Sequence, residues 1–80
     1  MSASRSAKAV VRNPVLALPA ISALQALSPD SRRALRLVLK DLQADARAKA
    51  DKCWRTHKAP MAAYWKAVAV YANHTARALA

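Results

Sequence analysis

The stretch of residues 28–58 constrains this chain most, because nothing in it interrupts a helix. Ser28 is a typical N-cap residue, and Pro29 suits the first position of a helix. No proline follows until Pro60, and most of the residues between are good helix formers such as Ala, Leu, Arg, Lys and Gln. The sequence therefore predicts one long helix over about 29–58.

The rest of the chain also favours helices. It contains no glycine and only four prolines in 80 residues, which disfavours tight turns, hairpins and β-sheet. Two further helices are predicted, over about 15–27 and about 60–79. The connection at Pro60 is short, so helices two and three are expected to form an antiparallel hairpin; a kinked continuous helix is the alternative. The fold class is all-α: a small three-helix protein.

The chain is long enough for one small domain. Residues 1–13 are small, polar and basic and show no periodicity, so they are expected to form a flexible arm, or a solvated tail without a role. Residues 14–80 form the single helical domain. The single cysteine cannot form an internal disulfide, which fits a cytoplasmic protein.

The third predicted helix is apolar on nearly all sides. Its larger apolar residues recur at helical spacing: Tyr64, Trp65, Val68 and Tyr71. We interpret them as core or interface rather than as a base-stacking platform. Only Lys66, Asn73 and Arg77 form a narrow polar stripe. Two neighbouring helices would hardly cover such a helix, which favours a homodimer through helix three.

The charge balance is strongly one-sided. Fourteen Lys and Arg residues stand against four Asp residues, which gives a net charge of +10. This balance predicts a polyanionic partner: nucleic acid, an acidic protein surface or an anionic membrane. A membrane is disfavoured, because no stretch reaches roughly 18 uncharged apolar residues and the apolar faces are needed for packing.

Positive side chains recur along one side of the long helix at three- and four-residue steps. These residues are Arg32, Arg36, Lys40 and Arg47, with Arg33 beside them. They span roughly 22 Å at about 1.5 Å per residue, enough for several phosphates of one strand. Trp54 follows near the same side, where it could stack on a base, and the arm adds Arg5, Lys8 and Arg12. The alternative is a solvated helix face that keeps the protein soluble.

No pattern predicts an active site or a metal site. Cys53 and His57 lie four residues apart, but with His74 they supply only three soft ligand candidates, and a structural zinc site needs four. Phosphate-cradling loops and oxyanion holes are typically built on glycine, which the chain lacks. We therefore predict a protein that is not an enzyme and uses no metal or cofactor.

Residues 52–78, KCWRTHKAPMAAYWKAVAVYANHTARA, resemble the short all-helical proteins of phages and other mobile elements, a class that includes the anti-CRISPR proteins. The resemblance is one of size, charge and style, and it transfers no catalytic or binding motif. It implies an inhibitor that docks on a host nucleoprotein, such as a CRISPR effector complex, and blocks its nucleic-acid target binding.

The residues themselves favour a direct role on nucleic acid. The expected function is to bind DNA or RNA through phosphate contacts, with the inhibitor as the alternative. Strong sequence specificity is not expected, because the last helix has few cations and the chain shows no helix-turn-helix pattern.

Overall fold

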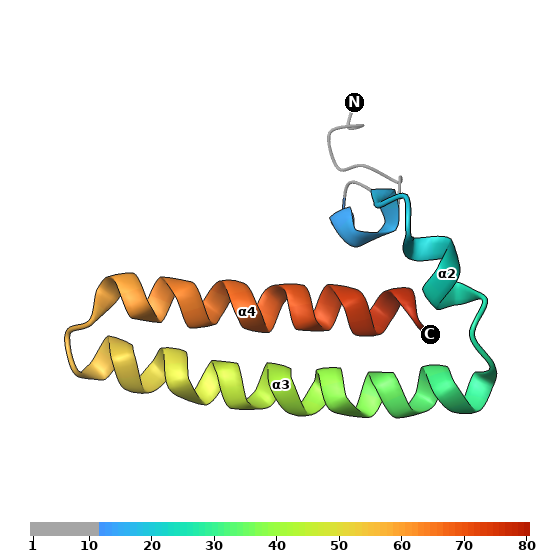
Figure 1. Ribbon diagram of the computed structural model, residues 1–80. Helices are drawn as coiled ribbons and strands as arrows, with labels where there is room; N and C mark the ends of the chain where they lie inside the picture. The colour runs from blue at the N-terminus through green and yellow to red at the C-terminus, as the bar shows by residue number, and fades with distance from the viewer. Residues whose placement is uncertain (1–11) are drawn as a thin grey trace.

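The computed structural model describes residues 12–80, and these form helices joined by short turns (Figure 1). In chain order they are the 3-10 helix η2 (Pro14–Ala17) and the α-helices α2 (Ile21–Gln25), α3 (Pro29–Arg55) and α4 (Ala59–Ala78). The helices α3 and α4 lie side by side and antiparallel along their length. No strand occurs in this part of the chain. The predicted all-α fold with its helical hairpin is confirmed, and the alternative of one kinked helix is wrong.

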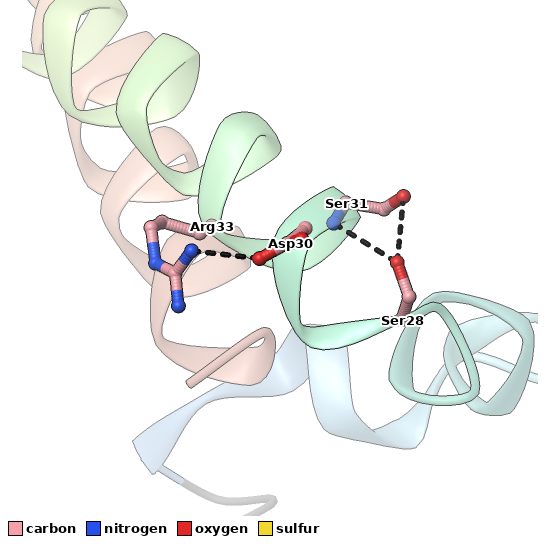
Figure 2. Close-up of polar contacts among 4 residues, drawn as sticks. All are labelled: Ser28, Asp30, Ser31 and Arg33. Carbon is pink, nitrogen blue, oxygen red and sulfur yellow. Dashed lines mark hydrogen bonds and ion pairs between the residues drawn. The ribbon is translucent and has the colours of Figure 1, made fainter.

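The N-terminus of α3 forms as its sequence predicts. The Oγ atom of Ser28 accepts a hydrogen bond from the backbone N–H of Ser31 at 3.1 Å, which satisfies one of the free donors of the first turn (Figure 2). Pro29 lies in the first turn, and the Asp30 carboxylate lies there beside the positive end of the helix dipole. Local signals alone therefore determine where this helix begins.

The C-terminus of α3 differs from the prediction, because the helix ends at Arg55 and not at Lys58. His57 adopts a left-handed backbone conformation, with φ of 62°. Its N–H donates to the carbonyl of Trp54 at 3.2 Å, and the N–H of Lys58 donates to the carbonyl of Cys53 at 2.8 Å. This pair of hydrogen bonds is the Schellman motif, which usually has glycine at the left-handed position. The long helix thus closes before Pro60 has any effect.

The segment before α3 is not the single helix predicted over about 15–27. It forms η2 and α2, separated at Pro19, whose nitrogen has no hydrogen to continue a helical ladder. Within this segment, η2 packs against α4 (Figure 1). The Asn13 side chain fixes this position, because its Nδ2 donates to the carbonyl of His74 at 2.8 Å while its Oδ1 accepts from the N–H of Val15.

The two long helices meet along a seam of small side chains. In α4 the seam follows alternating steps of three and four residues, the spacing at which one side of a helix faces a single neighbour. Its most buried members are Ala46 of α3 and Ala62, Ala69, Ala72 and Ala76 of α4. No large side chain among residues 12–80 is fully buried, and Leu79 comes nearest at 2% exposed. The hairpin therefore packs closely but encloses little apolar volume.

The aromatic residues of α4 are less buried than a core requires. Trp65 and Val68 are half-buried, but Tyr64 is 55% exposed and Tyr71 is 54% exposed. The two tyrosines are therefore not core residues of one chain, and their interpretation as interface residues stays a prediction. The reason lies in the shape of the molecule, which measures 41 × 39 × 17 Å. A thickness of 17 Å is less than two stacked layers of helices of about 10–12 Å each would need, so both broad sides of the hairpin remain uncovered.

Candidate nucleic-acid interface

Three cations of α3 lie along one side of the hairpin. Arg36, Lys40 and Arg47 are all exposed. They are separated by four and seven residues, steps that return to the same side of a helix. From Arg36 to Arg47 the distance along the axis is about 16 Å at about 1.5 Å per residue. The central part of the predicted series is therefore continuous and accessible.

The first two members of that series are placed differently. Arg32 is half-buried, and its Nε atom is covered by the protein without a hydrogen-bond partner. Arg33 is exposed, but its Nη1 atom lies 2.9 Å from a carboxylate oxygen of Asp30 (Figure 2). Arg32 lies close to the seam and Arg33 is partly neutralised, so both contribute less to this side than the sequence predicts.

The polar stripe of α4 joins the cations of α3. The Nζ atom of Lys40 donates a hydrogen bond to Oδ1 of Asn73 at 3.1 Å, so these two residues lie on the same side of the hairpin. Lys66 and Arg77 lie seven residues before and four residues after Asn73, and therefore on that side as well. We call this surface the basic face. Its cations are Arg36, Lys40, Arg47, Lys66 and Arg77.

Sequence reasoning missed the contribution of α4. The stripe of Lys66, Asn73 and Arg77 is visible in the sequence, as is the series on α3. What the sequence does not give directly is the rotation of each helix about its own axis within the hairpin. The alternating three- and four-residue spacing of the alanines in α4 is the signal that could have fixed that rotation.

A groove of about 670 Å³ runs between the helices on the basic face. Trp54, 69% exposed, and Val70, 43% exposed, contribute apolar surface to the groove, and several alanines form the rest of its apolar lining. Arg47 and Lys66 lie at the same groove, one from each helix. Apolar surface beside two cations suits a flat ring that carries an anionic group. The predicted placement of Trp54 near the cations agrees with this geometry.

Most of the acidic residues lie away from the basic face. Asp45 forms an ion pair with Lys49 at 2.9 Å, and the Lys49 Nζ lies 4.6 Å from the centroid of the Trp65 ring on the opposite broad side. Asp41 lies one helical turn before Asp45. Asp51 lines the groove and forms no ion pair within residues 12–80. One carboxylate thus remains among the five cations of the basic face.

The other candidate residues do not come together. Arg12 is exposed, next to Asn13 at the start of the described chain, while Arg5 and Lys8 lie outside the described residues. Cys53 is half-buried near the end of α3, and the carbonyl of His74 accepts a hydrogen bond from Asn13 near the other end of the hairpin. Within residues 12–80, no three His, Cys, Asp or Glu side chains are grouped so that they could hold a metal ion.

In the same range, no helix has the length and apolar character needed to cross a membrane.

Comparison of the chain with models of known protein families, with curated proteins and with solved structures gives no match. The candidate site is therefore defined by the geometry of this chain alone. Its main features are five cations from two helices on one broad side, a groove between those helices, and one exposed tryptophan at that groove.

Proposed function

We propose that this protein binds nucleic acid through the basic face, by contacts to phosphates and without enzymatic activity. The observation that carries the proposal is the joining of two cationic stripes, one from α3 and one from α4, on a single flat side. Arg side chains can bind a phosphate through two parallel hydrogen bonds, and each neutralised phosphate releases counterions. Binding is therefore expected to be strong at low salt and to weaken steeply as salt rises.

The shape of the basic face supports backbone contact rather than reading of base edges. Two helices of about 10–12 Å diameter lie side by side, so the face is roughly 20 Å wide. The major groove of B-DNA is about 12 Å wide and admits one helix, but not this pair. The protein is therefore expected to lie across the phosphates and to discriminate little between sequences.

Trp54 gives the basic face a preference among nucleic acids. An exposed indole beside Arg47 and Lys66 can stack on a base only when that base is free of its partner strand. We therefore expect tighter binding to single strands than to duplexes of the same length. Replacement of Trp54 by leucine should remove most of this preference and leave the salt dependence unchanged.

The proposal is tested by titrating the purified chain with DNA and RNA oligonucleotides at several salt concentrations. Two double variants each remove one lysine and one arginine of the basic face: Lys40→Gln with Arg47→Gln on α3, and Lys66→Gln with Arg77→Gln on α4. Each lost phosphate contact should lower the slope of log affinity against log salt by about 1, so each variant should lower it by about 2.

The matched control is Arg55→Gln with Lys58→Gln, which removes the same charge at the end of α3 and in the following turn, away from the groove lining. This variant should keep a slope close to that of the unchanged protein. Equal losses in all three variants would mean that only net charge matters and would reject the basic face as a site. Weak binding to DNA and RNA even at low salt would reject the proposal and favour the inhibitor that docks on a nucleoprotein.

A further inference from the structure

The broad side opposite the basic face exposes large apolar side chains. Trp65 marks this side, because Lys49 lies over its ring, and Tyr64 meets the same ring edge-on with centroids 5.0 Å apart. Residues at three-, four- and seven-residue steps from these positions lie on the same side. We call this surface the apolar face. Its exposed members are Val38 (64%), Leu42 (39%), Met61 (46%), Tyr64 (55%) and Tyr71 (54%).

The apolar face exposes larger side chains than the seam buries. The most buried positions of the hairpin are alanines, whereas the apolar face carries two tyrosines, a methionine, a valine and a leucine. Large apolar residues gathered on one exposed side usually mark an interaction surface. In a molecule 17 Å thick, a second layer on this side would turn these side chains into a core.

Charge indicates that the second layer is another copy of this chain. The protein carries a net charge of +10, so most of its surface repels a second copy. The part of α3 next to the apolar face is an exception, because it carries two acids and two bases: Asp41, Asp45, Lys49 and Lys52. A two-fold interface brings each patch against itself, so the acids of one copy can lie opposite the bases of the other.

The size of the apolar face fits a dimer. A helix of 20 residues such as α4 is about 30 Å long, and two helices side by side are roughly 20 Å wide. The face therefore offers roughly 600 Å² of flat area, and side-chain relief makes the accessible area larger. A standard interface buries about 800 Å² on each partner.

We propose that two copies associate through their apolar faces and form a four-helix layer with both basic faces turned outward. The association itself does not depend on nucleic-acid binding. Its consequence rests on the proposed function: the dimer holds two nucleic-acid segments at once, one on each side, and so bridges them.

The association is tested by light scattering and sedimentation equilibrium on the purified protein. The expected mass is twice the 8.7 kDa of one chain. Val38→Glu should weaken the dimer by 100-fold or more, because it places one carboxylate from each copy in the apolar interface. Leu37→Glu is the matched control: Leu37 is also 64% exposed, but it is turned by about 100° toward the outer edge of α3.

Circular dichroism establishes that both variants remain helical, and Tyr64→Ala provides a milder change on the same face that should also weaken the dimer. A mass of 8.7 kDa for the unchanged chain at high concentration would overturn the proposal. Equal effects of Val38→Glu and Leu37→Glu would also overturn it.

Bridging is tested by capture of a labelled oligonucleotide on an immobilised one. The unchanged protein should retain the label. Val38→Glu should bind the immobilised strand but lose capture, and Lys40→Gln with Arg47→Gln should remain dimeric but bind weakly. Undiminished capture by a monomeric Val38→Glu variant would overturn bridging through the apolar face. If the unchanged protein is dimeric but binds no oligonucleotide, this result would instead reject the proposed function.

Discussion

A chain without glycine has to end its longest helix with a residue that carries a side chain. His57 occupies the left-handed position of the capping turn between α3 and α4, and it is the only residue with positive φ within residues 12–80. For an L-amino acid this conformation costs about 1 kcal/mol or more, because Cβ lies too close to the backbone. The hydrogen bonds of the turn offset this cost by satisfying carbonyls at the end of α3.

His57→Gly should therefore stabilise the protein by about 1 kcal/mol, since glycine adopts this conformation without the steric penalty. For a chain of this length the gain corresponds to an increase in Tm of about 4–8 °C, measured by thermal unfolding at fixed protein concentration. The control is His57→Ala, which keeps Cβ and should give no gain. Equal stabilisation by alanine would show that the imidazole, and not the backbone, is unfavourable at this position.

At the scale of the helices, the seam of alanines determines how the hairpin packs. Ala46 is completely buried and Ala69 is 3% exposed, each near the middle of its helix. Small side chains let two helices approach closely, and close approach leaves no space for a larger residue. The seam therefore also fixes which side of each helix faces solvent, and with it the composition of the basic and apolar faces.

Ala46→Leu should destabilise the protein by about 1–3 kcal/mol, because the added atoms force the helices apart. Ala48→Leu, at an exposed position two residues further along α3, should change stability by less than about 0.5 kcal/mol. Urea unfolding of both variants provides the comparison. Tolerance of leucine at position 46 would mean that the helices are not in close contact there.

The helices were more predictable than their ends and rotations. Ser28 and Pro29 are local signals, so the start of α3 follows from sequence alone. The end of α3 was wrong because a proline was taken as the only possible stop, whereas a histidine in a glycine-like conformation stops the helix first. The segment before α3 broke into two short helices because Pro19 interrupts it.

Only part of the candidate site was predictable, because sequence periodicity groups residues on one helix but does not show how two helices face each other. Arg36, Lys40, Arg47 and Trp54 can be grouped from the periodicity of one helix. Lys66 and Arg77 belong to a second helix, and their position beside the first depends on tertiary packing. Arg32 is misassigned for the same reason, because its burial depends on the neighbouring helix and not on its own spacing.

At the scale of the whole molecule, the hairpin has two dissimilar broad sides. The basic face repels its own copies, whereas the apolar face carries exposed valine, methionine and tyrosine side chains next to balanced charges. In so flat a molecule the two faces lie back to back, so one does not block the other. Association and nucleic-acid binding can therefore be altered separately by substitution.

The alanine seam also has a consequence for heat capacity. Unfolding raises the heat capacity in proportion to the apolar surface it exposes, about 12–15 cal/mol/K per residue in ordinary domains. A hairpin that buries mainly methyl groups and leaves its larger apolar residues in water exposes little new apolar surface when it unfolds. The monomeric Val38→Glu variant should fall below this range in scanning calorimetry, and the unchanged protein should exceed the variant. An equal heat capacity change in the two proteins would contradict this expectation.

A small heat capacity change flattens the curve of unfolding free energy against temperature. The single hairpin should therefore lose stability only gradually on warming or cooling, without a sharp optimum. The associated form buries more apolar surface and should have a more strongly curved profile. Cooling should then weaken association more than it weakens the hairpin. A change of temperature alone should therefore shift the protein between a dimer with two basic faces and a monomer with one.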